Sequence, residues 1–114
     1  MNIVTFGEAM IRLTPPHFMR LEQTYSFNVE VGGAELNVAT GVVRLGHQAE
    51  WVSALPPNSL GRLVRNHARR LGVGTSHIVW KEGTRVGLYF LEEGASPRAS
   101  RILYDRAGSA ISQI

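Results

Sequence analysis

The spacing of hydrophobic positions changes period twice in the first part of the chain. Residues 2–6 form a short β-rich apolar run that ends at Gly7, which predicts a buried first strand. Residues 25–31 alternate apolar and polar side chains, as expected of a strand with one covered and one solvated face. From Ala34 to Leu45 the period becomes helical, and Gly46 stands where a left-handed C-terminal cap is expected. The first 45 residues therefore predict a strand, a long connection that contains a second strand, and a helix.

The next part repeats the alternation of strand and helix. Residues 50–55 predict a second core strand, and the loop at 56–59 offers Asn or Ser as the N-cap of a following helix. That helix is expected to run to about Leu71 and to stop at Gly72, before another strand at 77–80. Such alternation implies right-handed crossovers and a parallel sheet covered by helices. We therefore expect the α/β class.

The last third of the chain has a different pattern. Residues 85–91 and 101–106 are two strand candidates joined by a loop at 94–98 that contains Gly, Ser and Pro. The two strands predict a hairpin. Together with the strand at 25–31, the hairpin predicts a small second sheet that is separate from the main one.

Composition narrows the class of protein. The chain has 114 residues, of which 44% are hydrophobic and 18% charged, which suits one ordinary domain. It has no Cys, and its four His lack the spacing of metal ligands, so no disulfide or metal site is expected. No apolar stretch approaches the roughly 18 residues of a membrane span, and the N-terminus does not resemble a signal peptide. A cytoplasmic protein without a membrane partner is expected.

The positive charge of the chain raises the question of nucleic-acid binding. The formal net charge is +3, and the densest group of cations consists of Arg62, Arg65, Arg69 and Arg70. Their spacing is helical, with apolar residues on the other side, which favours the solvated face of an amphipathic helix. No aromatic residues are interleaved with these arginines, and no helix-turn-helix or RNA-binding signature accompanies them. We expect no nucleic-acid partner, and steep salt dependence of binding would be the sign of one.

The candidate binding motif is the paired glycine that precedes the first helix. Gly32 and Gly33 lack the Cβ atoms that block a ligand, and the first amides of the helix are left as free donors for oxygen atoms. Asn37 lies one turn into the helix, where its amide can both donate and accept. The alternative is a tight turn with Asn37 packed locally. The third glycine of a dinucleotide fingerprint and the Gly-Lys of a phosphate-binding loop are both absent.

Residue types around this motif resemble a known family. Gly-Gly-Ala-Glu-Leu-Asn-Val-Ala at 32–39, followed by Arg-Leu-Gly-His at 44–47, resembles the N-terminal signature of the ribokinase-like (pfkB) carbohydrate kinases. Gly-Leu-Tyr at 87–89 and Tyr-Asp-Arg-Ala-Gly-Ser-Ala at 104–110 are most similar to the 2-keto-3-deoxygluconate kinases within that family. Further matches follow in the family's order at 51–55, 60–62, 71–73 and 75–77. The resemblance covers essentially the whole chain.

The resemblance implies a fold and a division of the chain. It implies the N-terminal part of a ribokinase-like fold, in which a Rossmann-like parallel sheet with helices carries a small β lid. Residues 1–114 would then belong to a single kinase domain. Lid strands are expected within about 11–31 and 85–106, and elements of the α/β core within about 1–8 and 34–80.

The resemblance also implies a substrate and a set of contacts. It implies an ATP-dependent kinase that phosphorylates a hydroxyl group of a small-molecule sugar acid. The residues that match the family's substrate-binding positions are Gly32, Gly33, Asn37, Tyr89, Tyr104 and Arg106. Residues two apart on a strand share a face, so Tyr104 and Arg106 should point together, although ordinary sheet packing is the alternative for either tyrosine. The guanidinium of Arg106 can form two parallel hydrogen bonds to one carboxylate. This attraction would offset the repulsion between Glu35, at the start of the helix, and the carboxylate of the substrate.

Parts of the family pattern are absent from the chain. The Gly-Ala-Gly-Asp motif, whose aspartate is the family's general base, does not occur in these 114 residues, so no catalytic residue and no metal ligand are assigned. ATP and Mg²⁺ are expected to bind mostly outside this chain, which alone is predicted to be inactive. The family usually has a small residue where Glu35 stands and a glycine where Pro56 stands. An alternative of another class is a non-catalytic module that binds sugar acids or forms a homodimer through the lid sheet.

Overall fold

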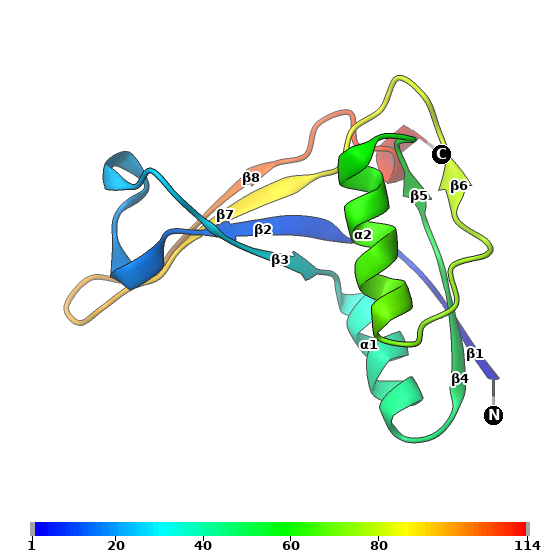
Figure 1. Ribbon diagram of the computed structural model, residues 1–114. Helices are drawn as coiled ribbons and strands as arrows, with labels where there is room; N and C mark the ends of the chain where they lie inside the picture. The colour runs from blue at the N-terminus through cyan, green and yellow to red at the C-terminus, as the bar shows by residue number, and fades with distance from the viewer. Residues whose placement is uncertain (1, 114) are drawn as a thin grey trace.

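The computed structural model describes residues 2–113 and consists of an α/β unit from which a separate sheet extends to one side (Figure 1). In the α/β unit, two pairs of parallel strands are joined through two helices. Its elements are β1 (Asn2–Phe6), α1 (Ala34–Arg44), β4 (Gln48–Val52), β5 (Ala54–Leu55), α2 (Ser59–Arg70) and β6 (Val79–Trp80). The parallel strands and the alternation with helices confirm the expected α/β class.

The extending sheet has four strands and is called the lid sheet below. Its strands are β2 (Met10–Thr14), β3 (Asn28–Gly32), β7 (Leu88–Glu92) and β8 (Arg101–Asp105). Their order is β3-β2-β7-β8; β2 runs parallel to β7, whereas β2 with β3 and β7 with β8 are antiparallel pairs. The predicted hairpin is therefore present. Short 3-10 turns η1 (Pro16–Phe18) and η2 (Leu21–Gln23) follow β2, and η3 (Ile111–Gln113) ends the described chain.

Both helices begin and end where the sequence indicates. Asn58 is the N-cap of α2, and its side-chain oxygen accepts a hydrogen bond of 3.0 Å from the amide of Gly61. Gly46 and Gly72 follow the two helices with φ angles of +91° and +84°, the left-handed region that glycine enters without steric cost. On α1, Glu35 lies in the first turn and Arg44 in the last, which suits the helix dipole at both ends.

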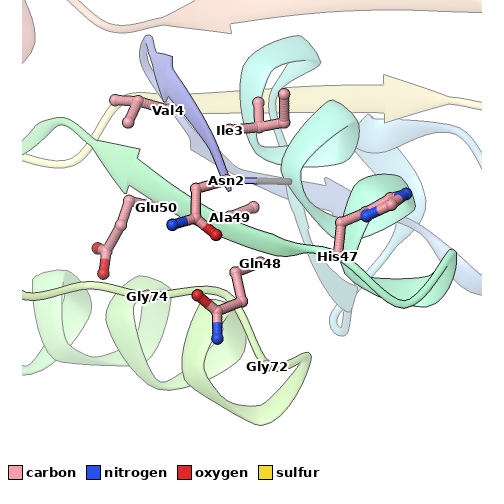
Figure 2. Close-up of a pocket in the computed structure, with 9 residues that line it drawn as sticks. All are labelled: Asn2, Ile3, Val4, His47, Gln48, Ala49, Glu50, Gly72 and Gly74. Carbon is pink, nitrogen blue, oxygen red and sulfur yellow. The ribbon is translucent and has the colours of Figure 1, made fainter.

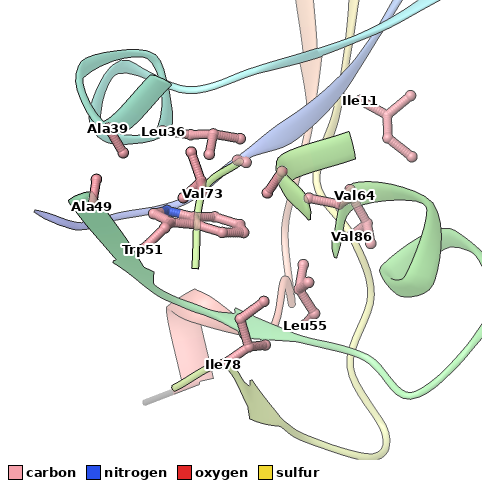
Figure 3. Packing of buried hydrophobic residues seen from close by; sticks show 12 residues of the cluster. Ile11, Leu36, Ala39, Ala49, Trp51, Leu55, Val64, Val73, Ile78 and Val86 are labelled. Atoms are coloured by element: carbon pink, nitrogen blue, oxygen red, sulfur yellow. The ribbon is translucent and has the colours of Figure 1, made fainter. Parts of the chain in front are cut away.

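The hydrophobic core lies between the helices and the strands of the α/β unit (Figure 3). Trp51 is its largest member and is fully buried, and its indole nitrogen donates a hydrogen bond of 3.1 Å to the carbonyl oxygen of Gly7. Ile11 and Val86 connect the root of the lid sheet to this cluster. The remaining members include Leu36, Ala39, Ala49, Leu55, Val64, Ala68, Val73 and Ile78. One continuous core therefore fixes the lid sheet at its root.

Two expectations about burial are wrong. β1 is not buried on both faces, because α1 covers one of its faces while Val4 and Phe6 on the other remain 68% and 59% exposed. The strand expected at 25–31 begins only at Asn28, and its apolar side is covered only toward its C-terminal end: Val31 packs against the core, whereas Tyr25 is fully exposed and Val29 is 53% exposed. In both cases the pattern identifies an apolar face, but the described part of the chain leaves much of that face uncovered.

Strand boundaries differ in three further places. The strand expected at 50–55 is interrupted at Ser53, and only two residues of the strand expected at 77–80 form β6. β2 was not assigned a strand of its own from its pattern. Its sequence Met-Ile-Arg-Leu-Thr alternates weakly, because Arg12 and Thr14 lie on one face with Met10. It forms in the middle of the lid sheet because β3 and β7 pair with it on both sides.

Candidate functional site

A cleft of about 470 Å³ lies between the lid sheet and the N-terminus of α1. Five of the six residues expected to contact a substrate line it: Gly32, Gly33, Asn37, Tyr89 and Tyr104. Its other lining residues are Met10, Arg12, Glu30, Val31 and Ala34. The chain leaves the lid sheet at Gly32 and enters α1 at Ala34, so the cleft lies between the sheet and the start of the helix. Residues that are far apart in the sequence therefore line the same cleft.

The floor of the cleft is a row of four side chains across the lid sheet. In the strand register, Glu30 is opposite Arg12, Arg12 is opposite Tyr89, and Tyr89 is opposite Tyr104. Directly opposite residues share a face of a sheet, which explains why all four line the same cleft. The rings of Tyr89 and Tyr104 are 5.9 Å apart between centroids. The row therefore presents an ion pair at one end and two phenols at the other.

Both glycines of the turn lie close to other atoms of the chain, and at Gly33 the neighbouring atoms belong to the backbone. A Cβ at Gly32 would lie 2.7 Å from the hydroxyl oxygen of Tyr89, and a Cβ at Gly33 would lie 2.5 Å from the carbonyl oxygen of Glu8. The sequence argument assigned the missing Cβ atoms to space for a ligand. The structure shows that they also let Tyr89 reach over the turn and let α1 begin against the segment after β1.

Asn37 faces the cleft from the first turn of α1. Its backbone amide donates to the carbonyl of Gly33 at 2.8 Å, which closes the first turn of the helix. Its side chain is exposed and has no hydrogen-bond partner within residues 2–113, so it is not packed locally as the alternative supposed. The Glu35 carboxylate lies against Gly7 and does not line the cleft. The negative charge of Glu35 therefore lies outside the cleft, where it repels a bound carboxylate less than expected.

Arg106 lies beside the cleft but does not line it. Its guanidinium carbon is 5.2 Å from the centroid of the Tyr104 ring, so the two side chains do point together, as expected from their spacing. The nearest carboxylate is that of Glu8, with 3.8 Å between Nη1 and Oε1. The side chain of Arg106 is 55% exposed, whereas Oε2 of Glu8 is buried without a hydrogen-bond partner within the described chain. Arg106 is thus held loosely at the rim of the cleft.

Sequence reasoning did not single out Glu8, Met10, Arg12 or Glu30 at this site. Glu8 follows the carboxyl end of β1, a position where side chains of α/β sheets often meet ligands. Arg12 and Glu30 are each flanked by apolar residues on both sides in their strands, and the alternation alone assigns them only to a polar face. Their pairing depends on the register of β2 and β3, and that register became visible only in the structure.

A larger hollow of about 550 Å³ lies at the other end of the α/β unit, and Figure 2 draws the residues that line it. It is lined by Asn2, Ile3, Val4, His47, Gln48, Ala49, Glu50, Gly72 and Gly74. These residues lie at the amino ends of β1 and β4 and in the loop after α2. Ligands of parallel α/β sheets generally bind beyond the carboxyl ends of the strands, so the cleft at the lid sheet is the stronger candidate site.

The pKa values of two groups near the cleft, His67 and Asp105, are shifted by their neighbours. A groove between β3 and α2 holds His67, and burial together with the nearby Arg70 lowers the pKa of His67, while Glu30 acts in the opposite direction. On the lid sheet, a 2.8 Å hydrogen bond from Arg85 lowers the pKa of Asp105. The side chain of Asp105 is 50% exposed, and the residue is opposite Leu88 in the register, outside the lining of the cleft.

The arginines of α2 form a solvated helix face, as expected. Arg62, Arg69 and Arg70 are exposed while Val64 and Ala68 are buried on the other side. Arg65 lies over the ring of Trp80 at 5.6 Å, an aromatic contact that the sequence did not indicate. Within residues 2–113 no cluster of three or more His, Asp or Glu side chains is arranged to hold a metal ion. No helix in that range is long and apolar enough to cross a membrane.

Comparisons with known proteins agree on one family. The sequence profile of the pfkB family carbohydrate kinases matches residues 1–113. The 2-dehydro-3-deoxygalactonokinase of Haloferax volcanii is 44% identical over 110 residues, which are 96% of this chain and 34% of that protein. The 5-dehydro-2-deoxygluconokinase of Bacillus subtilis is 33% identical over 105 residues, which are 90% of this chain and 32% of that protein.

A solved structure gives the same result. The crystal structure of the 2-dehydro-3-deoxygluconokinase from Thermotoga maritima superimposes with a TM-score of 0.95 and 51% sequence identity. The match covers 100% of this chain and 35% of that one. The expected ribokinase-like fold is confirmed. The chain spans about a third of the length of the curated relatives and of the solved structure that it matches.

Proposed function

The chain belongs to the pfkB family of carbohydrate kinases, and on that basis we propose that it forms the sugar-binding part of a 2-keto-3-deoxy sugar acid kinase. One observation carries the proposal. Gly32, Gly33 and Asn37, which match positions common to the family, line a single cleft with Tyr89 and Tyr104, which match the ketodeoxygluconate kinases. The names of the Haloferax and Thermotoga relatives, in which 2-dehydro is a synonym of 2-keto, support the same class of substrate.

In this proposal the sugar acid lies across the two tyrosines. The phenol rings of Tyr89 and Tyr104 contact its carbon chain, and Asn37 and the amides after Gly33 meet its carbonyl and hydroxyl oxygens. Arg106 swings from its loose contact with Glu8 to bind the carboxylate with two parallel hydrogen bonds. The stacking of Arg106 on Tyr104 places the charge at the end of the row where the carboxylate would lie.

The transfer step itself requires groups that these residues do not provide. Transfer of the γ-phosphoryl group of ATP to a primary hydroxyl depends on alignment and on neutralisation of the phosphate charge. The described residues do not fit an ATP or Mg²⁺ site, because they contain no carboxylate cluster and no phosphate-binding loop. We place ATP, Mg²⁺ and the general base in the other two thirds of a complete kinase of this family. The 114 residues alone are expected to show no turnover in an ATP-coupled assay.

Replacement of Arg106 tests the substrate assignment. In the complete kinase, Arg106→Ala should raise the Kd for the sugar acid about 10- to 100-fold, the range expected for lost hydrogen bonds to a charged group. Binding of the corresponding neutral sugar should change little. Arg101→Ala is the matched control, because Arg101 lies at the start of β8, whereas Arg106 follows its end, and Arg101 does not line the cleft. Unchanged affinity for the acid relative to the neutral sugar would contradict the proposal.

A second candidate function is a module that binds sugar acids without catalysis or that forms a homodimer through the lid sheet. It is favoured by the face of the lid sheet opposite the cleft. There Val29, Leu13, Phe90 and Leu103 form an apolar row in the strand register, and Val29 and Leu103 are 53% and 58% exposed. A homodimer through this face is compatible with the kinase proposal, and a cytoplasmic location is proposed for both functions.

A further inference from the structure

Arg12 and Glu30 form an ion pair inside the cleft. They are directly opposite each other on β2 and β3, and the terminal Nη2 of Arg12 donates to Oε2 of Glu30. The side chain of Arg12 is 31% exposed and that of Glu30 is 62% exposed. Both residues line the cleft beside Tyr89, so the pair faces the space proposed for the sugar acid.

The pair has unused hydrogen-bonding capacity. A guanidinium has five N–H donors and a carboxylate has about four acceptor positions. Within the described chain, Glu30 is the hydrogen-bond partner of Arg12, and Nε of Arg12 is buried without a partner. A buried N–H group without a partner costs free energy, so the guanidinium gains by moving slightly to donate to an oxygen atom of a ligand. The pair is therefore fixed in place at one contact while further donors and acceptors remain for a ligand.

The chemistry of the pair suits a hydroxyl group. A hydroxyl both donates and accepts, and adjacent Arg and Glu side chains satisfy both requirements at once. The two charges compensate each other, so the pair gives little net attraction for a carboxylate. Arg106 differs, because its nearest carboxylate lies at 3.8 Å and its charge remains available for the acid group.

The spacing along the row allows one molecule to reach both arginines. Arg12 and Tyr104 are two strands apart, which corresponds to about 10 Å between their backbones at the usual strand spacing. Arg106 lies over Tyr104 at one end, and Glu30 lies at the other. A six-carbon acid across the tyrosines, with its carboxylate at Arg106, directs the hydroxyl groups of its middle carbons toward Arg12.

We propose that Arg12 and Glu30 together bind the C4 hydroxyl of the sugar acid and thereby determine which epimer is accepted. This inference rests on the proposed function. The 2-keto-3-deoxy forms of gluconate and galactonate differ only in the configuration at C4. A donor and acceptor pair fixed at adjacent positions of two strands binds one configuration of that hydroxyl and leaves the other without partners, which lowers transition-state stabilisation for the wrong epimer.

The test compares both epimers as substrates of the complete kinase. Arg12→Met keeps the apolar stem and removes the donors, and Glu30→Leu removes the acceptors. Each variant should lower kcat/KM for the preferred epimer at least about tenfold more than for the other, equivalent to about 1.4 kcal/mol. The KM for ATP should not change. Arg12→Lys retains a donor and the ion pair and should recover part of the discrimination.

Arg85→Met is the matched control. Arg85 also forms an ion pair on the lid sheet, with 2.8 Å between its Nη1 and Oδ1 of Asp105, but it does not line the cleft. This variant should leave the ratio of kcat/KM values for the two epimers unchanged. Because Glu30 is more than half exposed, Glu30→Leu should fold even if Arg12→Met does not.

The outcomes separate the inference from the proposed function. An active wild-type kinase whose epimer ratio stays unchanged in Arg12→Met and Glu30→Leu overturns the inference and leaves the proposed function in place. Equal losses for both epimers have the same meaning, since they indicate a structural role for the pair. A wild-type kinase that phosphorylates neither epimer contradicts the proposed function, and the inference falls with it.

Discussion

The α/β unit and the lid sheet of this chain differ in where they place their apolar side chains. In the α/β unit, Trp51, Leu36 and Val64 are fully or almost fully buried in one cluster. In the lid sheet, all five residues of β8 are exposed, and the side chains of Val29 and Leu103 remain more than half exposed. The α/β unit therefore supplies most of the stability, whereas the lid sheet keeps side chains free for binding. The two regions meet where Gly33 contacts Glu8 and Ala9.

Removal of a large core side chain from the α/β unit should lower the stability of the protein more than any other change considered below. Trp51 is 0% exposed and its indole N–H is hydrogen-bonded, so Trp51→Ala leaves both a cavity and an unpaired carbonyl at Gly7. We expect a loss of about 3–5 kcal/mol in the free energy of unfolding, measured by urea denaturation. Loss of this side chain should also abolish sugar binding, because the root of the lid sheet packs on the same cluster.

Trp80 provides the matched control for Trp51. It is 39% exposed and contacts Arg65 through its ring. Trp80→Ala should cost only about 1 kcal/mol, the range of an exposed cation–π contact and a little buried area. Similar losses for the two tryptophans would show that the core of the α/β unit does not dominate stability.

The next largest loss of stability is expected when the contact of Gly33 with the segment between the α/β unit and the lid sheet is disturbed. Gly33→Ala would place a Cβ 2.5 Å from the carbonyl oxygen of Glu8 and 3.1 Å from Cα of Ala9, both backbone atoms that cannot move aside easily. We expect a loss of about 1–3 kcal/mol in the free energy of unfolding, as for other overpacked sites. Because the start of α1 must shift, sugar binding in the complete kinase should weaken as well.

Gly41→Ala is the control for this substitution. Gly41 lies inside α1, and a Cβ there would meet no atom within 4 Å. Since alanine favours the helix by about 1 kcal/mol relative to glycine, this variant should be more stable than the wild type. Equal effects at both glycines would show that the contact with Glu8 does not restrict the turn.

The same division explains which parts of the fold the sequence could predict. Helix ends depend on local chemistry, so the cap at Asn58 and the positive-φ glycines at 46 and 72 were predictable to within one residue. Burial depends on which layer covers a strand. The apolar faces of β1 and β3 were identified correctly as apolar, but their exposure could not be predicted from the alternation alone.

At the candidate site, too, the sequence predicted the residues of local motifs but not those that become neighbours through strand pairing. Residues next to a distinctive motif, such as Gly33 and Asn37, were assigned from the paired glycines, and Tyr89 and Tyr104 from the family resemblance. Arg12 and Glu30 were not, because they become neighbours only through the strand register. Arg106 was predicted to meet the substrate, and the structure places it at the rim of the cleft, where its role remains a prediction.

The smallest expected effect concerns the groove where β3 of the lid sheet faces α2. His67 lies there with Val29, Leu63 and Arg70, and its pKa is lowered by burial and by Arg70. The unfolded chain, with a pKa near 6.5, therefore binds more protons than the folded chain as the pH falls below neutrality. Above about pH 7.5 both states are neutral at this site, and His67 then makes no pH-dependent contribution.

Stability should thus decrease as the pH falls through 6.5 and toward the lowered pKa, and His67→Gln should remove that part of the decrease. Urea midpoints measured between pH 8 and pH 5 for wild type and variant check this expectation. Glu30 raises the pKa of His67 from the lid side, so Glu30→Gln should make the decrease on acidification larger than in the wild type. If His67→Gln and the wild type show the same pH profile, β3 and α2 do not hold His67 in a desolvated groove. The lid sheet would then contact the α/β unit only at its root.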